Sequence, residues 1–464
     1  MVTLLEHCRI GPPSAAAEVL LPVTFFDMIW LYFHPIQRLL FYEFSCSNSH
    51  FLETIVPNLK ASLSLTLKHF TPLAGNLVHP LIGSSKPVFQ YKPGDSVSLT
   101  IAEANEAFDF NYLTGNQPRD SDDFYGFVPE LPPEKIELDS KIIPLLALQV
   151  TLFPNAGICI GFTNHHSIGD ASSIVGFIKA WSSVTKFVGD EQFLAGNSLP
   201  FYDRSVIKDP SGLATKFWNQ MSIFKIESLP LNFPTNKVRA TYILLESDIK
   251  KLKDLVIFKR PTLVHASSFT VTTAYVWTCL VKATAATTGD ETDGEEAEYF
   301  AFAVDARRRL NPPAPPTYFG NCLGLVYTES THEQLKGNDG FLIAAELIGE
   351  LISKKVNNKE EILKDAENWI SYFGELLNER ISGVAGSPKF DLYDTDYGWG
   401  NPKKFESVSI DGDGSMSLCK SREFEGGLEI GLSLSKPKMD AFAPIFFGGL
   451  HADDSMPINP KENF

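Results

Sequence analysis

Apolar residues recur with two different periods along the chain, one typical of helices and one typical of strands. Leu59, Leu63 and Leu67 stand four residues apart behind Pro57. A proline fits the first turn of a helix, and the four-residue spacing puts the leucines on one face. We therefore predict a helix that buries its leucine face and ends before the break at Pro72–Asn76.

The middle of the chain predicts a hairpin of buried strands. Two continuous apolar runs, Leu145–Phe153 and Ile158–Phe162, flank the turn residues Pro154–Gly157. The second run leads directly into His165 and His166. These histidines are therefore expected at a strand end, where loops commonly carry functional groups on a rigid frame.

The remaining predicted elements mix helices and strands. Asp170 is placed to cap a helix whose apolar positions are Ile174, Phe177, Ile178 and Trp181. Further helices are predicted over Ser268–Ala283, Phe341–Val356 and Ile362–Leu377, and strands over Phe302–Val304 and Leu428–Leu434. A last hairpin is predicted from Val408–Ile410 and Met416–Leu418 around a turn at Asp411–Gly414, and a solvated surface loop over Gly289–Glu298.

The order of these elements favours a two-domain α/β (α+β) protein. Strands and helices follow one another without the strict alternation of a Rossmann fold or a barrel. Periodicity weakens between residues 189 and 236, where prolines and polar residues gather. We predict an N-terminal domain over residues 1–190, a linker over 191–236 and a C-terminal domain over 237–464.

Composition and charge exclude several classes of function. Lys and Arg number 40 against 56 Asp and Glu, a net charge of −16, without the basic patch of a nucleic-acid binder. The 6 cysteines are scattered without C-x-x-C spacing, which argues against a disulfide framework and against a zinc cluster. We see neither a signal segment nor an apolar run near the ~18 residues that span a bilayer, and expect a cytosolic protein without a membrane partner.

The densest polar cluster is His165–Asp170, which reads H-H-S-I-G-D. A histidine with a pKa near 6.5 suits general-base work at neutral pH. The alternative is a pair of turn histidines followed by a helix cap. A metal site is disfavoured, because a third ligand at the usual spacing is missing from the nearby sequence.

A second cluster, Asp396–Gly400, reads D-Y-G-W-G and on its own predicts a tight structural turn. Together, His166-x-x-x-Asp170 and this cluster resemble the H-x-x-x-D and D-F-G-W-G motifs of the plant BAHD acyl-CoA-dependent acyltransferases, in the same order and in a chain of similar length. Tyr397 stands where the family usually has Phe.

Three other stretches extend the resemblance over nearly the whole chain. Thr24–Asp27 with Trp30, and Pro72–Leu77, match stretches of the same family. Tyr318–Cys322 reads Y-F-G-N-C and is similar to the subgroup that acylates anthocyanin and flavonoid glucosides, many of whose members use malonyl-CoA.

The resemblance implies two chloramphenicol-acetyltransferase-like domains with the active-site channel between them. It implies malonyl transfer from malonyl-CoA to a sugar hydroxyl, first the 6-OH, of a phenolic or flavonoid glucoside. The two small molecules would be the partners, malonyl-CoA serving as co-substrate without a permanently bound cofactor or metal. A monomer is expected.

By the family's spacing, His166 rather than His165 is the general base that deprotonates the sugar hydroxyl as it attacks the thioester. Other readings stay open at this point. The mechanism could pass through an acyl-enzyme on Ser167 or Cys159. The donor could be a hydroxycinnamoyl-CoA or acetyl-CoA, and the protein could be an inactive binder of CoA or glucoside.

Asp170 and Asp396 are expected to be structural. The resemblance implies an ion pair between Asp170 and an arginine of the second domain, with Arg307 as the first candidate and Arg309 as the second. It places Asp396, together with Trp399, in a structural loop beside the CoA channel.

The CoA phosphates are expected at Lys259, Ser267 and Ser268, with His265 and Ala266 alongside the chain. Serines at the start of a helix offer free N–H groups and a favourable dipole to an anion, although simple N-capping is the alternative.

Malonyl selectivity requires a cation or several hydrogen-bond donors near the reacting carbonyl. Arg38 is the first candidate, because it follows Trp30 in a stretch that matches a channel-lining region of the family. The alternative for Arg38 is an exposed helix residue.

Overall fold

Three β-sheets organise the chain in the computed structural model, which describes all residues except 1, 14–15, 82–84, 191–198, 225–233, 264, 289–294, 360, 377–378 and 452–464. The six-stranded sheet has the order β1 (Val2–Ile10), β6 (Val97–Ala104), β10 (Leu146–Phe153), β11 (Gly157–Asn164), β3 (Ile36–Glu43), β16 (Lys404–Ser407). The seven-stranded sheet has the order β14 (Leu323–Thr331), β13 (Ala297–Asp305), β15 (Arg380–Ala385), β17 (Met416–Lys420), β18 (Leu428–Ser435), β12 (Lys237–Leu244), β7 (Arg119–Asp120). A five-stranded sheet joins β2 (Val19–Pro22), β5 (Val88–Tyr91), β4 (Asn76–Pro80), β9 (Ser140–Pro144) and β8 (Lys135–Glu137).

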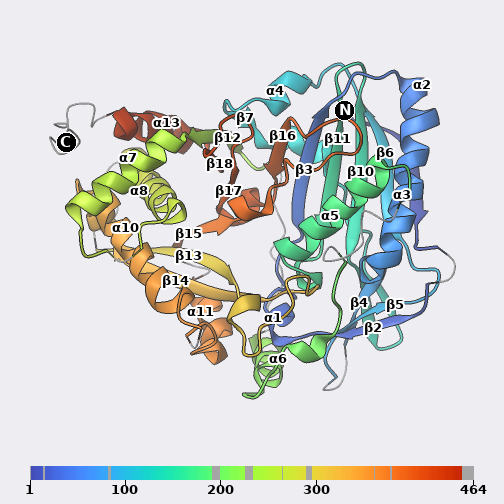
Figure 1. Ribbon diagram of the computed structural model, residues 1–464, viewed down its shortest axis with the longest axis horizontal. Helices are drawn as coiled ribbons and strands as arrows, with labels where there is room; N and C mark the ends of the chain where they lie inside the picture. The colour runs from blue at the N-terminus through green and yellow to red at the C-terminus, as the bar shows by residue number, and fades with distance from the viewer. Residues whose placement is uncertain are drawn as a thin grey trace, which may run out of the picture.

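The two large sheets and their helices form two halves (Figure 1). The six-stranded sheet, on the right of the view, carries α3 (Val56–His69) and α5 (Ala171–Lys186). The seven-stranded sheet, on the left, carries α7 (Glu246–Lys259), α8 (Ser268–Thr288), α10 (Gly340–Leu351) and α13 (Lys436–His451). The mixed α/β architecture that the sequence predicts is confirmed.

Two strands cross between the halves. β7, from the first third of the chain, pairs with β12 in the seven-stranded sheet. β16, from the last quarter, pairs with β3 in the six-stranded sheet. Each half therefore supplies an edge strand to the other, which holds the facing surfaces of the sheets in a fixed relation.

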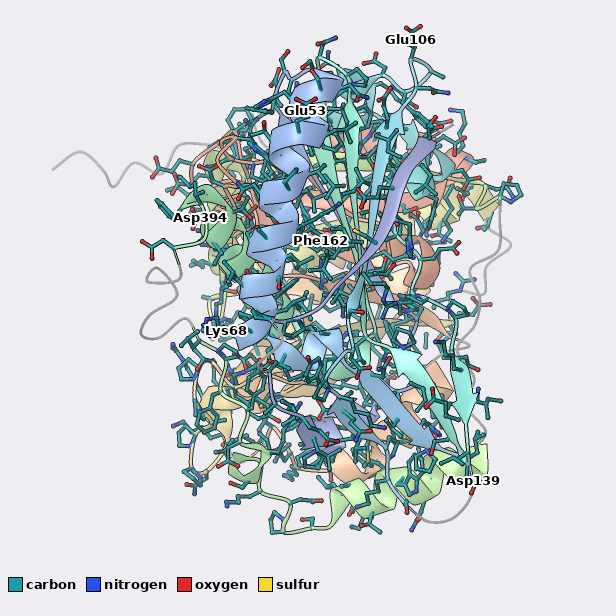
Figure 2. All side chains as sticks on the ribbon, turned by 90° about the vertical axis from the view of Figure 1, so that its right-hand side faces the viewer. Glu53, Lys68, Glu106, Asp139, Phe162 and Asp394 are labelled. Carbon is teal, nitrogen blue, oxygen red and sulfur yellow. The ribbon has the colours of Figure 1, made fainter. Side chains whose placement is uncertain are left out.

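The helix predicted from the leucine spacing is α3. Leu59, Leu63 and Leu67 are each 0% exposed, and Figure 2 looks onto the outer face of this helix, from near Glu53 above it to Lys68 at its lower end. The hairpin of β10 and β11 is confirmed as well, paired in register from Leu146 opposite Asn164 to Phe153 opposite Gly157.

Most other predicted elements are also present. α8, α10 and β18 lie where the sequence predicts them, and β13 includes the predicted strand at Phe302–Val304. The helix predicted to begin at Ile362 begins only at α11 (Trp369–Leu376). Asp365, at φ +61°, lies in the left-handed region, where a right-handed helix cannot continue.

The hairpin predicted around Asp411–Gly414 is wrong. The strand before this segment is β16, which belongs to the six-stranded sheet, whereas β17 after it belongs to the seven-stranded sheet. The connection includes the short helix α12 (Ile410–Asp413). Asp411 is 1% exposed and accepts hydrogen bonds from Arg239 and Tyr125, so the segment is fixed as a crossover between the halves.

The predicted surface loop is wrong at its end. Residues 289–294 lie outside the described residues, but Glu298 belongs to β13 and is 6% exposed. Its carboxylate pairs with His332 at 2.7 Å and with Arg380 at 3.5 Å. Neutralisation by these partners explains how an acidic residue is buried here.

Much of the predicted linker also lies outside the described residues, at 191–198 and 225–233. Between these gaps, α6 (Leu213–Phe224) contacts α1 (Phe25–Met28) and α11. Phe217 and Met221 of α6 are buried.

Candidate active site

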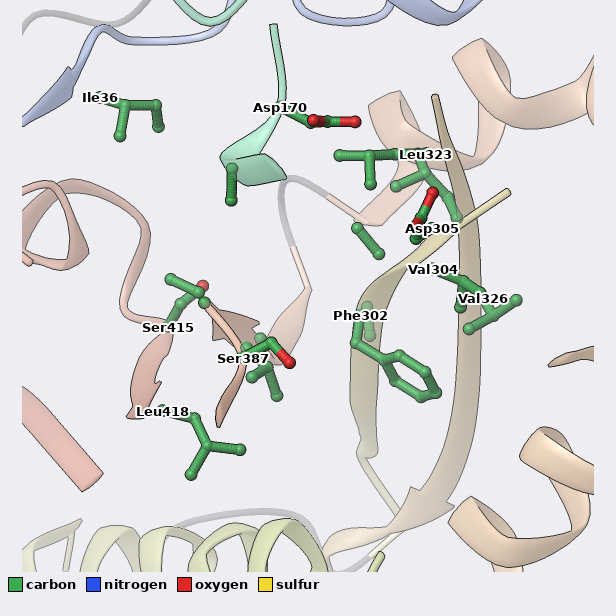
Figure 3. Close-up of a pocket in the computed structure, with 18 of the residues that line it drawn as sticks. Ile36, Asp170, Phe302, Val304, Asp305, Leu323, Val326, Ser387, Ser415 and Leu418 are labelled. Carbon is green, nitrogen blue, oxygen red and sulfur yellow. The ribbon is translucent and has the colours of Figure 1, made fainter. Parts of the chain in front are cut away.

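A cavity of about 2350 Å³ lies between the two halves. The N-terminal half lines it with Trp30, Arg38, His166 and Asp170 among others. Figure 3 shows part of this space, with Ile36 and Asp170 above and Phe302, Val304, Leu323 and Val326 of β13 and β14 beside it. A volume of this size can hold two small molecules at once.

His166 lies on the cavity wall just after β11, in a short 3-10 helix over His166–Ile168. Its ring stacks on Trp30, with 4.0 Å between ring centroids and 7° between the planes. Phe33 packs edge-on against it at 5.4 Å. Two aromatic side chains therefore fix the plane of the imidazole and leave it facing the cavity.

The His166 ring is neutral at physiological pH. Burial lowers its pKa to about 3, and the positive charge of Arg38 acts in the same direction. A neutral imidazole has a free lone pair and can accept a proton. The position and the charge state of His166 are therefore those of a general base.

His165 differs from its neighbour in its contacts. It is 8% exposed, and its Nδ1 accepts hydrogen bonds from the Ser167 hydroxyl at 2.8 Å and the Ser167 N–H at 3.3 Å. Burial lowers its pKa to about 4. These contacts make His165 the N-cap of the following 3-10 helix. His165 is therefore a turn histidine with a local structural role.

Asp170 forms a buried two-point ion pair with Arg307 of the other half. The two Asp170 oxygens lie 2.8 and 3.0 Å from the guanidinium nitrogens, and both side chains are 1% exposed. Asp170 also caps α5 by accepting the Ser173 N–H, and it accepts the Cys322 N–H at 3.1 Å. Arg309, the second candidate, instead donates to the carbonyls of Val356 and Asp305.

Asp396 organises its own loop. One oxygen accepts the N–H groups of Gly398 and Gly400 at 2.7 and 2.9 Å, and the other pairs with Lys186 at the end of α5. Gly398 and Gly400 have φ values of +97° and +86°, a region that favours glycine. Residues 396–400 are not among those that line the cavity, so a position of this loop beside the CoA channel stays a prediction.

Tyr397 carries a hydroxyl that is buried without a hydrogen-bond partner among the described residues. Its ring lies edge-on to Trp181 at 5.1 Å and stacks on Trp399 at 5.4 Å. Tyr397→Phe should therefore raise the free energy of unfolding by about 1–3 kcal/mol, because it removes an unsatisfied polar group and keeps the ring. Urea denaturation measures this change, and the activity should not move.

Tyr42→Phe is the matched control for this prediction. The Tyr42 hydroxyl is buried but bonded to Thr395 at 2.9 Å, so its removal should destabilise the protein. If Tyr397→Phe lowers stability as Tyr42→Phe does, the Tyr397 hydroxyl has a partner and the packing described above is incorrect.

The residues predicted for CoA fall into two groups. His265, Ser267 and Ser268 line the cavity, whereas Ala266 and Lys259 do not. Ser267 caps α8, because its hydroxyl accepts the Thr270 N–H at 3.2 Å. Simple N-capping was the alternative to phosphate binding for this serine. The Ser268 hydroxyl accepts a hydrogen bond from Lys253 at 2.9 Å. Lys253 therefore places a cation beside the start of α8, and no motif or periodicity in the sequence pointed to it.

Arg38 is a strand residue and not an exposed helix residue. It lies on β3 opposite Phe162 of β11 and faces the cavity. Burial lowers its pKa to about 10, so it stays charged at neutral pH. In the described part of the chain its one hydrogen bond goes to Asn164 Oδ1 at 3.4 Å, without a carboxylate partner.

The two candidate nucleophiles are poorly placed. Ser167 and Cys159 are each 0% exposed, and neither lines the cavity. Burial raises the pKa of the Cys159 thiol well above its ordinary value, which disfavours the thiolate. These observations argue against an acyl-enzyme at either residue.

Within the described ranges, no three His, Cys, Asp or Glu side chains gather as metal ligands. The described helices also include none that is long and apolar enough to cross a membrane.

Two solved structures share this fold over nearly the whole chain. The crystal structure of vinorine synthase matches with a TM-score of 0.70 and 20% identity, over 97% of this chain and 98% of that one. The first condensation domain of the calcium-dependent antibiotic synthetase matches with a TM-score of 0.55 and 14% identity, over 97% and 98%. The predicted chloramphenicol-acetyltransferase-like fold is therefore confirmed.

The sequence matches the Transferase family over residues 1–446, and the chain belongs to this family, the BAHD acyltransferases.

Three relatives align with nearly the whole chain. Phenolic glucoside malonyltransferase 1 of Nicotiana tabacum is 50% identical over 97% of this chain and 99% of its own. The malonyl-coenzyme:anthocyanin 5-O-glucoside-6'''-O-malonyltransferase of Salvia splendens is 47% identical over 97% and 96%. The malonyl-coenzyme A:anthocyanin 3-O-glucoside-6''-O-malonyltransferase of Dahlia pinnata is 43% identical over 97% and 98%.

Proposed function

We propose that this protein transfers a malonyl group from malonyl-CoA to a sugar hydroxyl, the 6-OH, of a phenolic or flavonoid glucoside. The observation that carries the proposal is the position of His166, whose ring stacks on Trp30 on the wall of the channel between the two halves. The names of three relatives at 43–50% identity support the donor and the acceptor class. Action in the cytosol as a monomer stays our prediction.

The proposed reaction is direct transfer. His166 accepts the proton of the sugar hydroxyl while that oxygen attacks the thioester carbonyl. The tetrahedral oxyanion then collapses and expels the CoA thiolate, which takes up a proton. The channel holds both substrates, so a covalent enzyme intermediate is not required. The roles of Asp170, Arg307, Asp396 and Trp399 in this scheme are structural.

We place the CoA phosphates at the start of α8. The free N–H groups and dipole of this 21-residue helix favour an anion. Lys253 and Ser268 lie there, hydrogen-bonded to each other. His265, just before α8, lines the cavity and stays a candidate. Lys259, which is exposed at the end of α7, and Ala266 do not line the cavity and are more peripheral candidates.

Lys253→Ala should raise KM for acyl-CoA about tenfold, the loss of one charge-assisted hydrogen bond. A malonyl thioester of pantetheine, which has no nucleotide phosphates, should respond much less. Steady-state kinetics with both donors give the comparison. Lys250→Ala is the matched control, because Lys250 is an exposed lysine of the same helix, pairs with Asp254 and does not line the cavity. An equal rise in KM with both donors would show that Lys253 does not contact the CoA phosphates.

Arg38 supports the choice of malonyl-CoA as donor. A buried cation without a carboxylate partner is costly, and a ligand carboxylate would relieve that cost. The malonyl carboxylate is two bonds from the reacting carbonyl. The residue that binds this carboxylate must therefore lie close to the general base. Arg38 acts electrostatically on His166 and faces the same cavity.

Arg38→Ala should therefore narrow the preference for malonyl-CoA over acetyl-CoA by about tenfold or more in kcat/KM. The loss should fall on malonyl-CoA, since acetyl-CoA has no carboxylate to bind. Kinetics with both donors at one acceptor concentration measure the ratio. An unchanged ratio means that another group holds the carboxylate.

The proposed function is tested by donor competition. The protein is incubated with equal malonyl-, acetyl- and coumaroyl-CoA and a phenolic glucoside, and the products are identified by mass. We expect the malonylated glucoside to dominate. A hydroxycinnamoyl donor is the second candidate, because a coumaroyl-CoA:anthocyanidin 3-O-glucoside-6''-O-coumaroyltransferase of Arabidopsis thaliana is 36% identical over 96% of this chain. A dominant coumaroyl product would favour that candidate.

A further inference from the structure

Asn321 links the second half of the molecule to the backbone that carries His166. It lies between β13 and β14 and is 0% exposed. Its side-chain nitrogen donates to the carbonyl oxygens of His166 at 3.0 Å and Ser167 at 2.9 Å. A third acceptor, Asp27 Oδ1, lies at 3.2 Å. All three neighbours are acceptors, so the amide must point its NH2 group at them.

Asp27 fixes the position of this amide. The Asp27 carboxylate is 0% exposed and accepts the backbone N–H of Asn321 at 2.9 Å as well as the side chain. Its other oxygen accepts Arg204 at 3.2 Å and the hydroxyl of Thr24 at 2.7 Å. Asn321 is therefore held to Asp27 through both its backbone N–H and its side-chain NH2 group.

The His166 loop needs such an external restraint. The 3-10 helix that begins at His166 has only three residues, too few to be stable by itself. Nδ1 of His166 is buried without a hydrogen-bond partner in the described structure, so no other residue orients the ring through that atom. Apart from the stacking on Trp30 and Phe33, the direction of Nε2 depends on the backbone at His166.

We propose that Asn321 is a positioning residue for His166, one that clamps the His166 and Ser167 carbonyls and thereby aims the base at the acceptor hydroxyl. The inference rests on the proposed function, in which His166 is the base. A purely stabilising role explains the residue less well, because its Oδ1 is buried without a partner among the described groups. The unpaired Oδ1 lowers the stability of the folded protein. The hydrogen bonds of the NH2 group to the His166 loop offset this cost.

Two variants separate positioning from general damage. Asn321→Ala deletes the amide, and Asn321→Asp keeps its size but replaces the NH2 donor by an oxygen. Asn58→Ala is the matched control, since Asn58 also donates a side-chain N–H to a backbone carbonyl, that of Thr185 at 3.2 Å. Asn58 lies on α3 and does not line the cavity.

Two readouts are measured: kcat and KM for malonyl transfer, and the His166 titration by NMR of the imidazole nitrogens. We expect both Asn321 variants to lose about 10- to 100-fold in kcat with KM for malonyl-CoA nearly unchanged, the effect of a misaimed base. In Asn321→Ala the His166 pKa should also rise toward 6.5 as the loosened ring gains contact with water. Asn321→Asp is compared in kcat and KM alone, because its new carboxylate would raise the His166 pKa by its own charge. Arg38, His34 and His165, the other titratable groups that act on His166, remain in place. Asn58→Ala should change neither readout.

Folded Asn321 variants with wild-type kcat and an unshifted His166 titration would overturn the inference. A loss of stability alone, matched by Asn58→Ala, would overturn it too. If the wild-type protein transfers no acyl group, the proposed function fails, and the titration of His166 still decides whether Asn321 holds the ring. If Asn321→Asp does not fold, Asn321→Ala carries the test.

Discussion

Replacing His166 by alanine is expected to lower kcat about 10²- to 10⁴-fold, while KM for malonyl-CoA changes little. The ring lies on the channel wall and is neutral, with a pKa lowered to about 3. Its loss removes the proposed proton acceptor and leaves the CoA site that we propose at α8 intact. Steady-state kinetics with saturating glucoside measure both constants.

The pH dependence of kcat/KM tests the lowered pKa of His166. A group whose pKa is lowered keeps its neutral, active form far below pH 6.5, so the acid limb of kcat/KM should lie well below 6.5.

His165→Ala is the comparison variant, because His165 bonds Ser167 and does not line the cavity. It should lose stability through the cap of the 3-10 helix, with a smaller effect on kcat than His166→Ala. An active His166→Ala beside a dead His165→Ala would reverse the assignment.

Breaking the Asp170–Arg307 pair should destabilise the protein by about 3–5 kcal/mol. Either Asp170→Ala or Arg307→Ala leaves an uncompensated charge, because both side chains are 1% exposed. The pair also joins the His166 loop to the second half, so activity should fall together with stability. Urea denaturation and kinetics on the same preparations test both effects.

Arg308→Ala is the matched control, since Arg308 is the exposed neighbour of Arg307. It should change stability by no more than about 0.5 kcal/mol. Asp170→Ala with unchanged stability and no activity would contradict the structural role and assign Asp170 to the chemistry. The double variant Asp170→Ala/Arg307→Ala should recover part of the loss, because no lone charge remains buried.

Local patterns predicted the elements that carry the site. The leucine spacing of α3, the apolar runs of β10 and β11 and the cap at Asp170 depend on residues near one another in sequence. The placement of His166 at a strand end follows from the same runs. The family's spacing then separated His166 from His165, which chemistry alone did not.

Contacts between distant segments explain what the sequence did not predict. The pattern at 408–418 is that of a hairpin, but residues 408–410 form a turn and the start of α12, and the strand before them, β16, pairs with β3 in the other sheet. Lys253 meets Ser268 only because α7 packs against α8. Asn321 was visible in the Y-F-G-N-C stretch, yet its bond to the His166 carbonyl spans 155 positions. Sequence periodicity describes neighbouring residues and cannot predict contacts between distant segments.

The central claim is direct malonyl transfer with His166 as base, and the mass of the intact protein tests it most directly. The protein is mixed with malonyl-CoA alone and weighed, a phenolic glucoside is added, and protein and product are weighed again. We predict an unchanged protein mass at both stages and a malonylated glucoside that forms only after the acceptor is added. A malonyl adduct on the protein that passes to the glucoside, or the absence of malonylated glucoside, would contradict the account.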